Sequence, residues 1–435
     1  MRLRASAWLV VLVLSACATP PDKPPLPPAV PRPAPAPTPQ PAAPSTQPVP
    51  GPATLYPTLK PVDWSSVAFW TDDTPSEAWT AFMRGCSTLI KRADWQSVCS
   101  DAANLAAPDD AAVRAFFEQR FQPYQATQED GTTEGMVTGY YEPLLKGDLT
   151  RTGRARYPVL GPPDDLLTVD LTSVYPELKN LRLRGRLVGN KVVPYFTRKE
   201  IDSATSGFSG LPIAWVEDPI DLFFLQIQGS GRIELPDGSH LRVGYADQNG
   251  HPYQSIGRLL VERGELKLEQ ASMQGIKQWG LQNPDKLPDL LASNPSYVFF
   301  RPQPNGLPGP LGALGVPLTE RRSIAVDPRF IPLGAPVFLA TTQPNSALPL
   351  NKLVMAQDTG GAIRGGVRAD FFWGFGAEAG EQAGRMKQRG RMWVLLPKAP
   401  APAARAAVSE RKPPLPAMGG AGERPAERAA GRSIE

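Results

Sequence analysis

The sequence is poor in the residues that build metal and redox centres. Its 435 residues include two histidines and three cysteines. No HExxH, CxxC or EF-hand spacing occurs, so no metal site is predicted. The glycine-rich patterns of nucleotide-binding enzymes and the GxSxG turn of serine hydrolases are absent as well. Any acid–base chemistry therefore falls on carboxylates, and no metal or organic cofactor is implied.

The sequence also lacks a large excess of charge of either sign. Its formal net charge is +4, of which residues 1–17 carry +2 and residues 398–435 carry +3. The central part of the chain is therefore close to neutral, with a net charge of −1. A nucleic-acid-binding protein normally concentrates positive charge on its folded part. This distribution argues against nucleic acid as a partner.

Long hydrophobic runs are missing too. The longest at the N-terminus, residues 5–14, has about ten residues, whereas crossing a bilayer takes about 20. It follows Arg2 and Arg4 and runs into Leu14-Ser15-Ala16-Cys17. This arrangement resembles a bacterial lipoprotein signal peptide, in which the cysteine is lipidated and becomes the mature N-terminus. Ala18 favours sorting to the outer membrane of a Gram-negative bacterium, with the protein facing the periplasm.

Proline, by contrast, is abundant and clustered. The chain has 51 prolines, and fifteen of them lie within residues 20–50. Proline fixes φ and has no backbone donor, so residues 18–61 are predicted to be an extended tether. Residues 398–435 are rich in alanine, proline, glycine and charge, and a disordered tail is predicted there. In the oxidising compartment beyond the inner membrane, Cys86 and Cys99 either form a disulfide or remain two buried thiols.

Hydrophobic periodicity predicts helices and many short strands in the part between tether and tail. The predicted helices are 77–88, 111–121, 255–264 and 268–283, with a short one ending at Asn294-Pro295. The predicted strands are 136–141, 181–188, 223–228, 241–245, 297–300, 323–326, 336–339, 353–357 and 391–396. Asp237-Gly238 is predicted to be a hairpin turn. Short strands mixed with helices favour barrels over a doubly wound sheet.

Six segments in fixed order carry a resemblance to a known family. They are TGYYEP (138–143), IQGSG (227–231), GHPYQSIG (250–257), NPSYVFF (294–300), RSIAVD (322–327) and DTGGAI (358–363), the last leading to ADFF (369–372). Each is weak alone, but the ordered set is specific. Together they resemble the membrane-bound lytic murein transglycosylase A family, and the lipobox agrees with a membrane-bound member.

The resemblance implies a mainly β fold with helices (α+β). A double-psi β-barrel domain would carry a second, smaller β-barrel domain inserted in it, and the substrate groove would lie between them. The first domain would comprise residues 62–144 and 242–397, with a three-aspartate (3D) module at about 320–397. The inserted domain would comprise residues 145–241.

The resemblance also implies the reaction. The family cleaves the β-1,4 bond between N-acetylmuramic acid and N-acetylglucosamine in peptidoglycan, as a lytic exotransglycosylase (a carbon–oxygen lyase). The 6-hydroxyl of the muramic acid attacks its own anomeric carbon and forms a 1,6-anhydro product. Because the nucleophile is tethered to the substrate, one carboxyl group can suffice. Asp370 matches the catalytic position, and the apolar residues that follow it would raise its pKa.

The resemblance suggests roles for further residues. Asp358 is expected to be a second catalytic residue that orients a loop, hydrogen-bonds the surroundings of Asp370 or polarises the site, and Asp327 is expected to fix a turn. Substrate-binding roles are expected for two motifs; their residues are Thr138, Tyr140, Tyr141, Gln228, Gly229, Ser230 and Gly231. The alternative for the tyrosine pair is that one of the two faces the core, because strand residues alternate between faces.

Other functions stay open at this point. A water-using muramidase would need a second carboxylate, for which Asp358 is the nearby candidate. A non-catalytic peptidoglycan-binding lipoprotein, or a scaffold for complexes of cell-wall enzymes, would not need Asp370. The expected partners are peptidoglycan glycan strands and, through the lipid on Cys17, a membrane.

Overall fold

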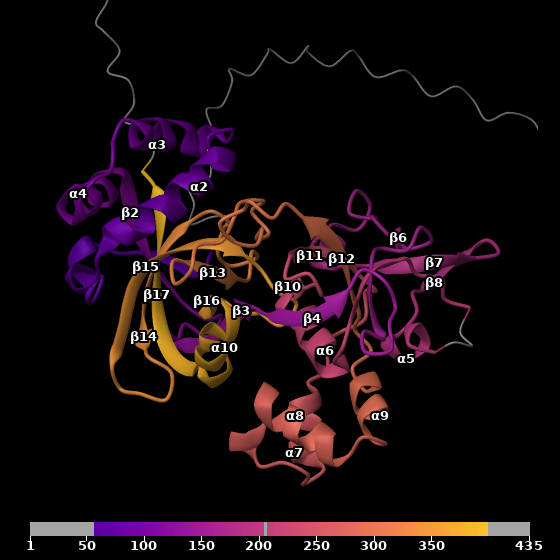
Figure 1. Cartoon of the computed structure of the whole chain (residues 1–435). Coiled ribbons are helices and arrows are strands. Elements are labelled where there is room, and N and C mark those ends of the chain that lie inside the picture. Colours follow the sequence, from indigo (N-terminus) through magenta and orange to yellow (C-terminus); the bar gives the residue numbers. More distant parts are fainter. Residues whose placement is uncertain (1–55, 204–206, 399–435) are drawn as a thin grey trace, which may run out of the picture. The chain divides into compact units, whose positions relative to one another are not determined.

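The computed structural model describes residues 56–203 and 207–398, and these form a sheet-dominated α+β structure (Figure 1). The predictions for Cys17, for nearly all of the tether and for the tail from residue 399 lie outside the described residues. Within the described ranges, no helix is both long and apolar enough to cross a membrane.

The larger sheet has eight strands in the order β1-β2-β17-β14-β15-β13-β16-β3. Strand β3 also pairs with β17, so six of the strands close into a ring. The strands are β1 (Leu59–Pro61), β2 (Phe121–Ala126), β3 (Gly135–Glu142), β13 (Ser323–Val326), β14 (Pro336–Thr342), β15 (Pro349–Asp358), β16 (Arg368–Phe375) and β17 (Lys387–Pro397). The predicted strands at 136–141, 323–326, 336–339, 353–357 and 391–396 are confirmed within it.

The first strand lies inside the range predicted to be tether. Leu59 pairs with Ala126 of β2 and is 1% exposed in the core of the larger sheet. The folded part therefore begins earlier than residue 62. Pro57 shortly before this three-residue strand and Pro61 at its end hid its strand character, because edge strands tolerate proline where central strands do not.

Three helices cover one side of this sheet: α2 (Trp79–Leu89), α3 (Ala93–Ala103) and α4 (Asp110–Arg120) (Figure 1). Short 3₁₀ turns precede them: η1 (Trp64–Ser66), η2 (Trp70–Asp72) and η3 (Pro75–Ala78). The aromatic rings of Phe82 and Phe117 meet at 5.1 Å between centroids and pack in one cluster with Phe338 and Trp393 of the sheet. Strand β14 is buried along nearly its whole length, since helices cover one face and the ring interior the other.

Cys86 of α2 and Cys99 of α3 form a disulfide, with 5.4 Å between their Cα atoms. Both sulfur atoms belong to residues of the buried helical core. The bond joins two of the helices that cover the larger sheet.

Removing this disulfide is expected to lower the free energy of unfolding by about 3 kcal/mol, because the unfolded chain loses the constraint of a closed loop. The measurement is urea denaturation of Cys86→Ala/Cys99→Ala beside the unchanged chain. Ser87→Ala/Ser100→Ala, at exposed positions of the same two helices, is the matched control. A loss no larger than that of the control would contradict the expectation.

The second sheet has six strands in the order β12-β11-β10-β4-β9-β5, and a three-stranded sheet β6-β7-β8 accompanies it. Its strands are β4 (Leu144–Asp148), β5 (Tyr157–Leu160), β9 (Pro212–Val216), β10 (Ser230–Glu234), β11 (His240–Gln248) and β12 (Val298–Gln303); the small sheet has β6 (Leu167–Thr168), β7 (Arg184–Val188) and β8 (Lys191–Pro194). The turn at Asp237-Gly238 joins β10 to β11 as predicted.

This second sheet extends beyond the inserted domain predicted at 145–241. Strand β11 pairs with β10 on one edge and with β12 on the other, which brings residues up to Gln303 into the sheet. The sequence could not show this, because residues 249–297 separate the two paired strands and carry helices of their own.

The helices between these strands are α5 (Arg198–Ile201), α6 (Pro219–Gln228), α7 (Ile256–Glu262), α8 (Met273–Gln282) and α9 (Leu287–Ala292), with 3₁₀ turns η4 (Pro176–Asn180) and η5 (Leu268–Gln270). Figure 1 shows α7, α8 and α9 grouped beside α6, and they share a core around Phe223, Leu260 and Trp279. The predicted helices at 255–264 and 268–283 are confirmed in α7 and α8, the latter preceded by η5.

The strand predicted at 223–228 is wrong, because these residues form the second half of α6. Asp218 accepts hydrogen bonds from the backbone of Ile220 and Asp221, and Pro219 occupies the first turn. Both features are standard helix starts. A short apolar run cannot by itself distinguish a strand from a buried helix.

Helix α10 (Gly376–Arg385) was not predicted from the sequence. Its Gly380 lies so close to the Tyr141 ring that an added Cβ would come within 2.8 Å of it.

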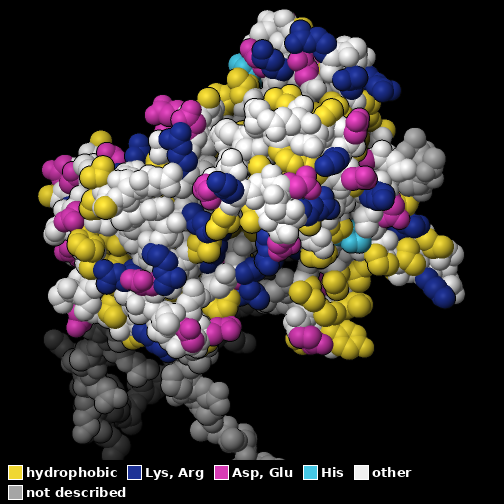
Figure 2. Space-filling model, turned by 90° about the horizontal axis from the view of Figure 1, so that it is seen from below, with side chains coloured by type: hydrophobic (Ala, Val, Ile, Leu, Met, Phe, Trp, Pro, Cys, Tyr) yellow, Lys and Arg dark blue, Asp and Glu magenta, His cyan; other side chains and the backbone are white. Residues whose placement is uncertain are grey.

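On the molecular face in Figure 2, basic and acidic side chains are interspersed, as expected for a folded part of near-zero net charge.

Candidate active site

Two of the three predicted aspartates flank one residue of the central strand β13. Ala325 pairs with Asp370 of β16 on one side and with Asp358 of β15 on the other. Paired strands lie about 4.8 Å apart, so the two backbones are about 10 Å from each other. Strands β15 and β16 follow each other in the chain but do not pair with each other. Strand β13 lies between them and brings their two aspartates to the same part of the sheet.

Asp370 is held by the neighbouring strand β3. The two strands are parallel and place Asp370 opposite Thr138. The Thr138 hydroxyl donates to Oδ1 of Asp370 at 2.5 Å. Among the described residues no partner is recorded for Oδ2 of Asp370. One carboxyl oxygen is thus fixed, and the other is available to a ligand.

The surroundings of Asp370 favour its protonated form. Burial raises the pKa of this carboxyl, although the Thr138 hydrogen bond and the Arg368 charge pull it down. The residue remains half-exposed, so a substrate can reach it. A carboxyl with a raised pKa can act as a general acid.

Asp358 is hydrogen-bonded at both oxygens. Its Oδ1 accepts from the backbone N–H groups of Ala313 at 3.0 Å and Thr359 at 2.9 Å, and its Oδ2 accepts from the Tyr140 hydroxyl at 3.0 Å. Burial raises its pKa to about 6 against these hydrogen bonds, and the charge of Asp370 adds to the rise. The two carboxyl groups therefore interact electrostatically.

The motif around β3 splits between two faces, as strand alternation requires. Thr138 and Tyr140 point towards the aspartates, and the Tyr140 ring lies 5.2 Å from that of Phe372. Burial raises the pKa of the Tyr140 hydroxyl well above its usual value, so this group stays protonated and donates to Asp358. Tyr140, Phe372 and Ala325 belong to a small apolar cluster beside the acids.

Tyr141 lies on the opposite face, in the core of the larger sheet. It is 7% exposed, and its hydroxyl lies 3.5 Å from the sulfur of Met273. The structure therefore does not bring this tyrosine to the aspartates. In the structure, Tyr140 lies at the candidate site and Tyr141 lies in the core, which is the alternative that strand alternation predicted for this pair.

The predicted glycine-rich segment ends α6 and begins β10. Gln228 accepts a hydrogen bond at Oε1 from the backbone N–H of Tyr141 at 3.0 Å, which ties the helix end to β3. Gly229 ends the helix with φ 78°, a conformation that favours glycine. A Cβ on Gly231 would meet Leu225 at 2.4 Å, so this glycine faces packed side chains. Ser230 is 8% exposed.

Asp327, the remaining aspartate of the pattern, has partners other than Asp358 and Asp370. It is fully buried, pairs with the guanidinium of Arg329 at 2.6 Å and accepts from the backbone N–H of Gly365 at 3.0 Å. These hydrogen bonds and the Arg329 charge outweigh burial and lower its pKa. Asp327 thus holds the turn after β13.

Arg368 is a site residue that the sequence analysis missed. Its Nη2 donates to the Thr138 hydroxyl oxygen at 2.9 Å. Because that hydroxyl has a single proton, accepting from Arg368 leaves the proton directed at Asp370. The signal was available: residues two apart on a strand share a face, and Arg368 stands two before Asp370.

Among the described residues, no three histidine, cysteine or acidic side chains gather as a metal site.

Comparison with known proteins supports the resemblance. Residues 136–301 match the MltA specific insert domain, and residues 322–396 match the 3D domain. Membrane-bound lytic murein transglycosylase A of Escherichia coli (strain K12) is 36% identical over 279 residues, which cover 62% of this chain and 68% of that protein.

Two crystal structures extend the comparison. MltA from Neisseria gonorrhoeae is 42% identical, with a TM-score of 0.68 over 79% of this chain and 94% of that one. E. coli MltA with bound chitohexaose is 30% identical, with a TM-score of 0.57 over 75% of this chain and 91% of that one. The ordered motifs, the fold and these relatives agree, and the chain belongs to the membrane-bound lytic murein transglycosylase A family.

Proposed function

We propose that this chain, as a peptidoglycan lytic transglycosylase, cleaves the β-1,4 bond between N-acetylmuramic acid and N-acetylglucosamine with Asp370 as its single acid and base. One observation carries the proposal. Asp370 has one oxygen held by Thr138, while its other oxygen has no recorded partner among the described residues. Its burial raises the pKa, as a general acid requires. The relative that binds chitohexaose supports a glycan as the ligand.

The proposed reaction needs no water. Asp370 gives its proton to the oxygen that leaves with N-acetylglucosamine, and the bond from that oxygen to the muramic acid C1 breaks. The muramic acid O6 forms a new bond to C1 and returns its proton to Asp370. Tethering the nucleophile to the reacting sugar replaces a bimolecular attack, and such proximity contributes several kcal/mol. Atoms balance, and the acid ends in its starting state.

The hydrogen bonds of Asp358 argue against a water-using muramidase. Such an enzyme needs a second carboxylate that activates water or attacks the sugar. Both oxygens of Asp358 already accept hydrogen bonds, three in all. We assign it a positioning role, because its hydrogen bond holds Tyr140 beside the acid.

Product analysis tests the proposal. Purified peptidoglycan is digested with the full-length protein in detergent, and the products are identified by mass spectrometry. The single-acid reaction gives anhydromuropeptides, which are lighter by one water than the products of hydrolysis. Reducing-end muropeptides would overturn the proposal in favour of hydrolysis. Binding to peptidoglycan without any product would favour a non-catalytic wall-binding protein.

Thr138→Val is expected to slow turnover about tenfold, because Asp370 loses the hydrogen bond that orients it. That hydrogen bond stabilises the carboxylate, so its loss should raise the Asp370 pKa further. The high-pH limb of the kcat/KM profile should then move to higher pH, since the acid stays protonated longer. The measurement is the pH–rate profile on peptidoglycan.

Thr138→Ser is the matched control for this variant, because it keeps the hydroxyl and removes a methyl group. It should retain the position of the high-pH limb. An unchanged limb in Thr138→Val would contradict the role given to the hydrogen bond.

We also propose that Cys17 carries the lipid anchor and that the proline-rich segment lets the enzyme reach the wall from the outer membrane. The family is named as membrane-bound, which supports membrane association. Radioactive fatty-acid labelling of the protein tests the anchor. No label, or label retained by Cys17→Ala, would overturn it.

A further inference from the structure

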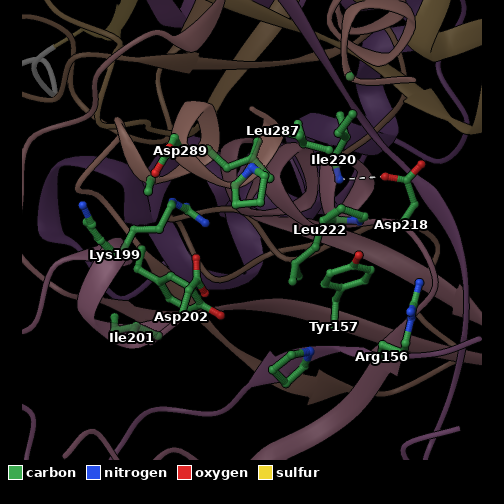
Figure 3. A pocket seen from close by; sticks show the side chains of 18 of the residues that line it. Arg156, Tyr157, Lys199, Ile201, Asp202, Asp218, Ile220, Leu222, Leu287 and Asp289 are labelled. Carbon is green, nitrogen blue, oxygen red and sulfur yellow. Dashed lines mark hydrogen bonds between the residues drawn. The ribbon is translucent and has the colours of Figure 1, made fainter. Parts of the chain in front are cut away.

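A cavity of about 940 Å³ lies in the part of the chain that matches the insert domain. It opens between β5, the end of α5, the start of α6, and helices α8 and α9, and all its lining residues fall within 156–297 (Figure 3). None of the residues around Asp370 and Asp358 described above contributes to it. Its size is within the range of binding sites for small molecules and short peptides.

Apolar side chains form much of the wall of this cavity. They include Leu160, Ile220, Leu222, Leu287 and Leu291, with the ring of the buried Tyr297. Such a wall suits small aliphatic groups. It offers little to a highly hydrated ligand such as a bare phosphate.

Several charged residues of the lining already form hydrogen bonds within the protein. The Arg198 guanidinium donates to the backbone carbonyls of Asn294 and Ser296 and lies 4.9 Å from the Tyr297 ring. Asp218 caps α6 through the backbone of Ile220, a contact visible in Figure 3. These groups shape the cavity, and their hydrogen-bonding capacity is largely used.

Four other charged side chains also line the cavity. Arg156, Lys199, Asp202 and Asp289 have exposed side chains, for which no hydrogen bond or ion pair with other described residues is recorded. Figure 3 shows Lys199, Asp202 and Asp289 on one side of the cavity and Arg156 on the other. Crowding by neighbouring atoms raises the Asp202 pKa, although the Arg198 charge opposes this. An ammonium group brought to Asp202 would stabilise its charged form.

We propose that this cavity binds a short peptide that carries a free ammonium group and carboxylates, with the ammonium at Asp202 and a carboxylate at Arg156. Two cations and two carboxylates, none of them in a recorded hydrogen bond or ion pair with another described residue, surround an aliphatic wall and complement such a ligand. An uncharged sugar chain offers none of the four a counter-charge. The inference rests on the proposed function in one respect: the peptide chemistry is that of the peptide chains attached to peptidoglycan. The cavity would then recognise the peptide part of the substrate.

The test is isothermal titration calorimetry of the full-length protein in detergent. The probe is the tetrapeptide that an amidase releases from purified peptidoglycan, used as released and after acetylation of its amino groups. The unchanged protein should bind the first form, and Asp202→Asn should bind it about tenfold more weakly, as for loss of a charge-assisted hydrogen bond. Acetylation should weaken binding to the unchanged protein by a similar factor.

Asp164→Asn is the matched control, since Asp164 is an exposed carboxylate of the same insert outside the cavity lining. It should bind the peptide as the unchanged protein does. Equal binding by Asp202→Asn, or equal binding of the acetylated peptide, would overturn the inference. Thermal unfolding of both variants checks that they are folded.

Cleavage of peptide-free glycan separates this inference from the proposed function. Asp202→Asn should cleave peptide-free strands at the unchanged rate and show a raised KM only on peptide-bearing peptidoglycan. If the unchanged protein makes no anhydro product from either substrate, the proposed function fails. The calorimetry decides the peptide site independently, because it does not depend on turnover.

Discussion

Asp370→Asn is expected to lower the rate of anhydromuropeptide formation by about a thousandfold or more. The amide keeps the size of the side chain but cannot deliver or take up the proton, and general acid–base catalysis contributes factors of about 10² to 10⁴. The proposed reaction uses the same group twice, so both proton transfers should be lost. The measurement is the initial rate of product release from peptidoglycan, followed by mass spectrometry.

Asp358→Asn is the comparison that tells a single acid from a pair. Asp358 holds Tyr140 and two backbone N–H groups, so its substitution should reduce the rate by only about tenfold. Equal losses in the two variants would favour a two-carboxylate mechanism. Full activity of Asp370→Asn would refute the assignment of the acid.

Arg322→Met is expected to lower the free energy of unfolding by about 3–5 kcal/mol, because the buried Asp73 carboxylate loses its closest counter-charge and keeps only the Lys352 ammonium, 3.7 Å away. The side chains of Arg322 and Asp73 are 3% and 2% exposed. Two hydrogen bonds, of 2.7 Å and 3.0 Å, join the guanidinium to the carboxylate. Arg322 also donates to the backbone carbonyl of Leu353 at 3.0 Å. Urea denaturation of the variant beside the unchanged chain measures the loss.

The ion pair between Arg322 and Asp73 also lies next to the strand that runs between the two candidate site aspartates. Arg322 stands directly before β13, the strand that carries Ala325 between the two aspartates. The control is Arg258→Met, whose partner Glu262 and own side chain are both largely exposed. Exposed pairs contribute about 0–1 kcal/mol, so this variant should be nearly neutral. Similar losses in the two variants would contradict the role assigned to burial.

Local sequence patterns predicted much of the larger sheet correctly. The four residues Ser323–Val326 form a strand with the predicted bounds, and the predicted segments at 336–339 and 353–357 lie within longer strands. Their near-continuous apolar character identified them, because both faces of these strands are covered. The turn at Asp237-Gly238 was predictable for an equally local reason, since Gly238 has φ 80°.

The errors came where local patterns allowed two answers. The apolar residues 223–228 fit a strand or a buried helix. The N-cap that marks the helix, Asp218, lies five residues before this segment. The extent of the second sheet depended on β11 pairing with β12, fifty residues later. Pairing across such a separation is decided by tertiary packing, which no local pattern reports.

The sequence by itself determined the family and nominated the candidate reacting groups. The ordered motifs nominated Asp370 and Asp358, and the shortage of histidine and cysteine left carboxylates as the acid–base groups. Only the tertiary structure decided what each group contacts. It placed Thr138 against Asp370, gave Asp358 three hydrogen bonds, turned Tyr141 into the core and added Arg368. The physical reason is that a motif fixes which side chains occur, whereas strand register and burial fix which of them meet and which form of a carboxyl is stable.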